Sequence, residues 1–240
     1  MVKISERLRT AAGLIGEGER LADVGTDHGY VPIYLVERKR IPSAIAMDIR
    51  TGPLERAREH IRMYGMEDYI QTRLSDGVAA LKLGEADTIL IAGMGGGLVI
   101  HILESGRVIC EQAHGLVLQP QSELPKVRRF LMENGYVTER EEMVMEDGKY
   151  YPMMRVHFDA SAVSHADSFT EEQELEFRYG KQLLTEKHPV LLAYLRWEVQ
   201  IQQDILTQLS GQQATEQIAA RIDDVKQILA QNARALAYYE

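Results

Sequence analysis

The residues best placed to do chemistry lie in one short loop. An apolar run, Leu21 to Val24, leads into Gly25, and Gly29 closes the loop. Glycine lets a backbone bend sharply and approach a ligand, and the first turn of a following helix offers unpaired N–H groups. We therefore predict a cofactor-binding loop between a strand and a helix. The alternative is a tight turn that binds nothing.

The acidic residues of the loop indicate which cofactor it suits. Asp23, Gly25 and Gly29 match Asp-x-Gly-x-Gly-x-Gly, the form that this loop takes in methyltransferases, but Asp27 replaces the middle glycine. A carboxylate there would repel the pyrophosphate of a dinucleotide, because like charges would meet in a partly desolvated site. The ammonium and sulfonium groups of S-adenosylmethionine tolerate it. The loop therefore favours methyl transfer.

Three further positions complete the predicted cofactor site. Asp48 ends a second apolar run, where an acid can accept both ribose hydroxyls. Asp76-Gly77 follows a third run and suits the adenine amine, although Ser-Asp-Gly is also a common turn. The run from Ala92 to Gly97 follows a fourth, where methyltransferases keep the residues that face the methyl group. The predicted cofactor residues are Asp23, Gly25, Thr26, Gly29, Asp48, Ile49, Asp76, Gly77, Ala92, Gly93 and Met94.

Alternating apolar runs and helical patterns must position these loops. A terminal hairpin is expected after Gly135, because two β-rich runs flank the turn signal Asp147-Gly148. The fold class is therefore α/β, a Rossmann-like class I methyltransferase fold with a mostly parallel seven-stranded sheet. The predicted strands cover residues 20–24, 43–48, 70–74, 88–92, 115–118, 136–145 and 150–158, with helices over 53–64 and 124–133.

The last third of the chain has a different pattern. Residues 159–168 are small and polar, which predicts a linker between a cofactor domain at 1–160 and a helical domain at 168–240. Apolar residues then recur with a 3-4 spacing on both sides of Ser210-Gly211, which predicts an antiparallel helical coiled coil. One more helix is expected from 170 to 186. This helical domain is either an arm for a large substrate or an element that only stabilises the fold or a dimer.

Composition excludes several classes of function. The net charge of −9 argues against a surface that coats nucleic acid, although a local basic patch is compatible with it. The single Cys110 permits no internal disulfide, and the chain has neither Cys-x-x-Cys nor His-x-x-x-His, so we expect no metal. Signal-peptide and membrane-span patterns are lacking, which predicts no membrane association and a cytoplasmic location. We expect a monomer or a weak dimer.

Two glycine motifs are specific enough to suggest a family. The segments 23–30 and 91–96, an N-terminal helix with Arg7-Leu8 and the helical tail together resemble the bacterial tRNA adenine-22 N1-methyltransferase family. The resemblance implies S-adenosylmethionine as the methyl donor. It implies tRNA as the partner and N1 of adenine 22, in the D-loop region, as the acceptor.

The residues favour a ring nitrogen independently. Enzymes that methylate exocyclic amines often carry Asn/Asp-Pro-Pro-aromatic after the fourth strand, where this chain has Ala-Gly-Met-Gly. A ring nitrogen already presents a lone pair, so alignment and a site for positive charge supply most of the catalysis. Asp27 is expected either to stabilise that charge or to bind the cofactor's ammonium group, and His28 to orient the base or relay a proton. The predicted substrate contacts are Tyr30, Gly95, Gly96, Arg7 and Arg9.

Two other functions stay open at this point. The same loop would serve a methyltransferase for a small metabolite, although that substrate leaves the long tail unexplained. The chain is also compatible with a non-enzymatic nucleotide-binding adaptor whose coiled coil binds a protein partner.

Overall fold

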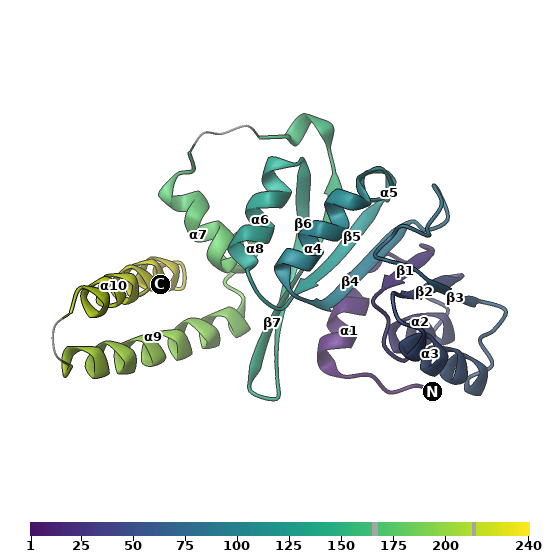
Figure 1. Cartoon of the computed structure of the whole chain (residues 1–240), viewed down its shortest axis with the longest axis horizontal. Coiled ribbons are helices and arrows are strands. Elements are labelled where there is room, and N and C mark those ends of the chain that lie inside the picture. Colours follow the sequence, from purple (N-terminus) through teal and green to yellow (C-terminus); the bar gives the residue numbers. More distant parts are fainter. Residues whose placement is uncertain (165–167, 213–214) are drawn as a thin grey trace. The chain divides into compact units, whose positions relative to one another are not determined.

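A computed structural model describes residues 1–164, 168–212 and 215–240. The chain divides into two compact units, Met1–Asp167 and Ser168–Glu240, which are taken in turn (Figure 1). Among the described residues, no helix combines the length and the apolar character that crossing a membrane requires.

The first unit is built on one seven-stranded sheet. Its strands are β1 (Leu21–Val24), β2 (Ala44–Asp48), β3 (Ile70–Leu74), β4 (Thr88–Met94), β5 (Gly115–Pro120), β6 (Tyr136–Glu146) and β7 (Lys149–Phe158). They lie in the order β3-β2-β1-β4-β5-β7-β6. All pairs from β3 to β5 are parallel, whereas β7 runs antiparallel to both β5 and β6. The predicted α/β fold, including its terminal hairpin, is confirmed.

Helices cover both faces of this sheet. They are α1 (Glu6–Gly13), α2 (Tyr30–Glu37), α3 (Thr51–Met63), α4 (Gly96–Ser105), α5 (Arg107–Gln112) and α6 (Leu124–Glu133), followed by the 3-10 helix η1 (Ala160–Ala162). The first three pack on one face, and α4 to α6 pack on the other. Alternate residues of a strand point to opposite faces, so Ala46 joins the first layer and Met47 the second. The inner parallel strands β1, β2 and β5 are therefore buried on both sides, whereas the edge strand β3 is only partly buried.

A half-buried ion pair ties the hairpin to the segment before β1. The guanidinium of Arg155, on β7, donates to Glu19 Oε1 at 2.9 Å and to the Leu14 carbonyl oxygen at 3.0 Å. The hydroxyl of Thr88, at the start of β4, donates to the same Glu19 carboxylate. These contacts lie at the amino ends of β1 and β4, away from the glycine motifs at their carboxyl ends.

Helices make up all the regular secondary structure in the described residues of the second unit. It contains α7 (Glu171–Tyr179), α8 (Lys181–Thr185), α9 (Pro189–Ser210) and α10 (Glu216–Ala237). The prediction of one helix over 170–186 was wrong, because Gly180 adopts φ 95° and separates α7 from α8. Part of the predicted linker forms η1, and its residues 165–167 lie outside the described residues.

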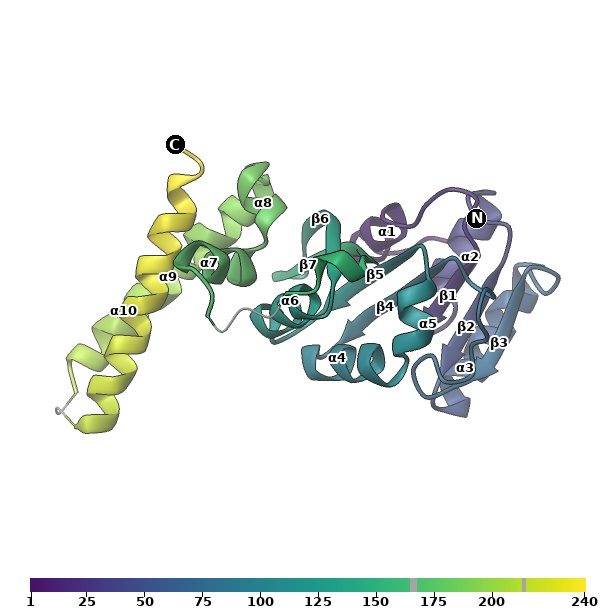
Figure 2. The same cartoon turned by 90° about the horizontal axis from the view of Figure 1, so that it is seen from above.

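The two long helices of this unit lie side by side (Figures 1 and 2). They run antiparallel, since Asn232 near the end of α10 donates to the Leu195 carbonyl oxygen near the start of α9, at 3.1 Å. Asn232 also donates to the buried carboxylate of Glu198 at 2.9 Å, and Tyr179 from α7 donates to the same carboxylate at 2.8 Å. A shared polar centre thus fixes three helices. The finer prediction of a coiled coil stays a prediction.

Candidate functional site

The carboxyl edge of the parallel strands carries the predicted cofactor residues. Val24 pairs with Met47 on β2 and with Ile91 on β4, so the residue that follows each of them lies at the same level of the carboxyl edge. Those residues are Gly25, Asp48 and Ala92. Loops that follow parallel strands in this way converge on one site. The register therefore brings three distant segments of the sequence together.

Asp23 is the most strongly perturbed acid of this edge. Its side chain is buried, and Thr26 Oγ1 donates to its Oδ2 at 2.6 Å. Burial raises the pKa of Asp23 to about 6, the Thr26 hydrogen bond opposes that rise, and the charge of Asp48 adds to it. The Thr26 backbone N–H also donates to the Met47 carbonyl oxygen at 2.8 Å. Thr26 thus ties Asp23 and the start of the loop to the end of β2.

The end of β2 offers the features that a bound nucleoside needs. Asp48 is 8% exposed and accepts a hydrogen bond from the Arg50 backbone N–H at 2.7 Å. Beside it, the large apolar side chains of Ile49 and Leu74 are 59% and 55% exposed. Asp76 and Gly77 follow β3, and the Asp76 side chain is exposed. A carboxylate for ribose hydroxyls next to open apolar surface for an adenine ring fits S-adenosylmethionine.

The glycines of the two motifs serve different purposes. A Cβ on Gly25, at φ 73°, would lie 2.1 Å from Cε of Met94, so Gly25 allows the two motifs to touch. Gly93 adopts φ 79°, and a Cβ there would be in van der Waals contact with Gln121 Nε2 at 3.8 Å and with Arg7 Nη1 at 3.9 Å. Gly25 thus lets the β1 and β4 loops approach each other, and Gly93 supplies a left-handed backbone conformation in the β4 loop.

Gly95 and Gly96 begin α4. A Cβ on Gly96 would lie 2.5 Å from the Ser122 carbonyl oxygen, and the Gly96 N–H donates to Ser122 Oγ at 3.3 Å. The N–H of Gly97 donates to Glu123 Oε2 at 2.9 Å. Gly96 is buried, and close packing against the loop after β5 explains why it is a glycine. Its role in substrate binding stays a prediction.

Asp27, His28 and Tyr30 lie at the exposed end of the β1 loop. Asp27 is paired with Arg56 of α3, whose Nη2 lies 3.0 Å from Asp27 Oδ1, and His28 Nε2 lies 3.4 Å from the same oxygen. The rings of His28, Tyr30 and His60 stack on one another with centroids 5.0 to 5.2 Å apart. The structure thus brings both predicted catalytic residues together with one predicted base contact.

His60 supports an unusual backbone conformation in this loop. His28 has φ 66°, a left-handed value that strains a residue with a Cβ. The Nδ1 atom of His60 lies 3.1 Å from the His28 carbonyl oxygen, at hydrogen-bond distance. His60 was not among the predicted site residues, because a histidine in the last turn of an amphipathic helix carries no spacing signal.

The two predicted arginines have different surroundings. Arg7 reaches the carboxyl edge, where its Nη1 donates to Gln119 Oε1 at the end of β5, at 2.9 Å. Arg9 is exposed and paired with Glu6 of its own helix. Gln119 was also missed, although a polar residue at the end of a buried parallel strand is a recognisable signal. Arg9 stays a predicted substrate contact.

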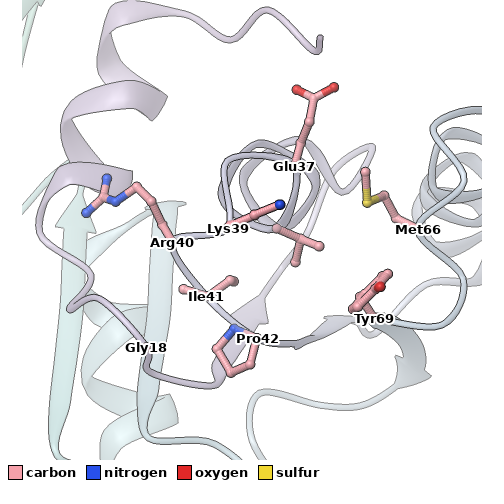
Figure 3. Close-up of a pocket in the computed structure, with 9 residues that line it drawn as sticks. Gly18, Glu37, Lys39, Arg40, Ile41, Pro42, Met66 and Tyr69 are labelled. Atoms are coloured by element: carbon pink, nitrogen blue, oxygen red, sulfur yellow. The ribbon is translucent and has the colours of Figure 1, made fainter.

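A hollow at the opposite edge of the sheet is separate from this site. Its volume is about 560 Å³, and Figure 3 shows Arg40, Ile41 and Pro42 on one side of it with Met66 and Tyr69 on the other. These residues precede β2 and β3, which places the hollow at the amino ends of the strands. None of the predicted site residues lines it. No group of three or more potential metal ligands occurs in the described ranges.

Comparison with known proteins agrees with the geometry. Residues 4–154 match a family model described as a methyltransferase domain. The chain is 34% identical over 236 residues to the tRNA (adenine(22)-N(1))-methyltransferase of Bacillus subtilis. This alignment covers 95% of this chain and 98% of that protein.

Two solved structures extend the similarity over nearly the whole chain. The crystal structure of the B. subtilis m1A22 tRNA methyltransferase TrmK matches with a TM-score of 0.82 and 32% identity, over 98% of this chain and 99% of that one. A Streptococcus pneumoniae protein, solved in complex with S-adenosyl-L-methionine, matches with a TM-score of 0.79 and 31% identity, over 95% of this chain and 100% of that one.

The pKa of Asp23 generates a prediction about stability. Because the folded chain holds a proton at Asp23 more tightly than the unfolded chain, Asp23 costs stability as the pH rises from about 4 to about 6. Asp23→Asn removes this cost while keeping an acceptor for Thr26. Relative to wild type, the variant should gain on the order of 2–3 kcal/mol across that range and no more above it. Urea unfolding between pH 4.5 and 7.5 measures the difference, and a gain that does not vary with pH would contradict it.

The contact of His60 generates a prediction about cofactor affinity. His60→Asn keeps an N–H donor at the position of Nδ1, whereas His60→Phe keeps a ring but removes the donor. If the hydrogen bond holds the loop, His60→Phe should weaken binding of S-adenosylmethionine about 5-fold, the equivalent of about 1 kcal/mol, and His60→Asn should stay within about 2-fold of wild type. Titration calorimetry measures both. The reverse order of the two variants would show that ring stacking holds the loop.

Proposed function

The chain belongs to the methyltransferase family, as does its relative, the tRNA (adenine(22)-N(1))-methyltransferase of B. subtilis. From this premise we propose that the chain methylates N1 of an adenine in tRNA. The methyl donor is S-adenosylmethionine. The adenine acted on is adenine 22, in the D-loop region, by analogy with the named relative.

One structural observation carries the proposal. Gly25, Asp48 and Gly93 lie at the carboxyl edge of the sheet, where an acid and open apolar surface are found together. We assign Asp48 to the ribose hydroxyls and the surface of Ile49 and Leu74 to the adenine ring of the cofactor. The β4 loop at Gly93 is assigned to the side of the site that faces the reacting groups.

The bound cofactor supplies a methyl group on a positively charged sulfur. The lone pair of adenine N1 forms the new bond to carbon as the bond from carbon to sulfur breaks, so positive charge moves onto the base. We propose that Asp27, with Arg56 balancing part of its charge, faces this developing charge. Tyr30, stacked with His28 and His60, offers a ring face to the target base. His28 is then placed to accept the N6 proton that methylation acidifies.

Access to the base and the location of the enzyme follow from the same proposal. An N1 atom held in tRNA structure is reached only when the base is exposed or flipped out, which costs a few kcal/mol. We assign the helical domain at 168–240 to holding the tRNA.

A tRNA substrate also implies a cytoplasmic enzyme. We propose separately that the enzyme acts as a monomer or weak dimer.

Transfer of labelled methyl from S-adenosylmethionine to unmodified tRNA, followed by nucleoside analysis, tests the proposal. Wild type should produce 1-methyladenosine. Asp48→Ala should weaken cofactor affinity about 10- to 100-fold, because hydrogen bonds to a charged group contribute roughly 1.5–3 kcal/mol. Asp68→Ala, which removes an exposed acid that precedes β3, is the control and should match wild type.

The other outcomes separate the alternatives. Cofactor binding without any labelling of tRNA would favour a small-molecule methyltransferase or an adaptor. Labelling at N6 of adenine would contradict the assignment of the acceptor atom.

A further inference from the structure

Gln119 is a buried polar side chain that the proposed reaction does not yet use. It lies near the end of β5 and is 0% exposed. Its Oε1 accepts two hydrogen bonds, from Arg7 Nη1 at 2.9 Å and from the Gly93 backbone N–H at 3.1 Å. One oxygen therefore joins helix α1 to the β4 loop at Gly93, in the loop that the proposed function assigns to the side facing the reacting groups.

The partners determine which way the amide points. A guanidinium and a backbone N–H are both donors, so the oxygen of Gln119, and not its nitrogen, must face them. Both lone pairs of Oε1 are then occupied. The Nε2 atom is buried, and within the described part of the chain it has no hydrogen-bond partner. An unpaired buried N–H group costs about 1–3 kcal/mol, so the two bonds to oxygen must outweigh that cost.

Arg7 is held from other directions as well. Its guanidinium lies over the ring of Tyr151 on β7, 5.4 Å from the ring centroid. Its backbone N–H donates to Glu146 Oε1, at the end of β6, at 3.2 Å. The terminal hairpin, helix α1 and the ends of β4 and β5 therefore meet around one arginine. Gln119 is the member of this group that bonds directly to the β4 loop.

We propose that Gln119 is a positioning residue for methyl transfer: its carbonyl oxygen fixes Gly93 and Arg7 relative to each other, and so fixes the wall against which the target base is aligned. This inference rests on the proposed function and names a residue that the sequence motifs leave out. It assigns the effect to the oxygen of Gln119. The unpaired Nε2, which offers a donor to an incoming ligand, is the competing explanation.

Two substitutions separate the oxygen from the nitrogen. Gln119→Leu keeps the approximate volume and removes both groups, whereas Gln119→Glu keeps an acceptor for Arg7 and Gly93 and removes the NH₂ group. With unmodified tRNA, Gln119→Leu should lower kcat about 10- to 100-fold, since small misplacements of reacting groups cost up to about 100-fold. Its affinity for S-adenosylmethionine should stay within about 3-fold of wild type, and Gln119→Glu should restore kcat to within about 3-fold.

A control addresses loss of stability alone. Thr88→Val removes a different side-chain hydrogen bond of the same sheet, the one that the buried Thr88 hydroxyl donates to Glu19. Thr88 lies at the amino end of β4, at the other end of the strand from Gly93. It should lower the melting temperature as Gln119→Leu does and leave kcat unchanged. An equal loss of kcat in Thr88→Val and Gln119→Leu would overturn the proposal.

A double-mutant cycle with Arg7 completes the test. Arg7→Met and Gln119→Leu remove the same contact, so the double variant should be no slower than the slower single variant, within about 2-fold. If the losses of kcat in the two single variants multiply in the double variant, Arg7 and Gln119 are not coupled and the proposal is overturned. If Gln119→Glu is as slow as Gln119→Leu, the positioning role belongs to Nε2 and not to the oxygen. A wild-type enzyme that methylates no tRNA would instead overturn the proposed function, whatever the variants do.

Discussion

Parallel pairing of β1 with β2 and β4 is the constraint on which the site depends. Because Val24 is in register with Met47 and Ile91, the residues that follow them, Gly25, Asp48 and Ala92, lie at one level of the carboxyl edge. Slipping one strand by a single residue would exchange its buried faces and separate the motifs. The two apolar layers that bury the sheet therefore also align the residues that we assign to the cofactor.

Charge at this edge matches the ligand that the family uses. Burial raises the pKa of Asp23 to about 6, and the nearby charge of Asp48 adds to that rise. Such a pair is costly beside a phosphate and favourable beside a sulfonium or ammonium group. Farther out, the pairing of Asp27 with Arg56 places opposite charges near the stacked rings. The site thus has two carboxylates at the strand ends and an ion pair of opposite charges near the stacked rings.

Local pattern was sufficient for the elements but not for the contacts between them. The predicted strand at 70–74 and the helix at 124–133 have the observed bounds, because apolar periodicity and turn residues are local signals. The break at Gly180 was missed, since a single glycine inside a helical pattern is often tolerated. Gln119 and His60 acquire their roles only through partners far away in the sequence, Arg7 and His28, and no spacing rule reports such pairs.

The most direct test of the central claim, that the carboxyl edge binds S-adenosylmethionine, is hydrogen exchange of the whole chain with and without S-adenosylhomocysteine, the unreactive product. Amides in segments 25–29, 48–50, 75–77 and 93–97 should exchange more slowly when the ligand is present. The ligand binds the native state and not the locally opened states, so it suppresses local opening. Protection of those segments together would support the account. Protection confined to residues 39–42 and 66–69, around the hollow at the amino edge, would contradict it.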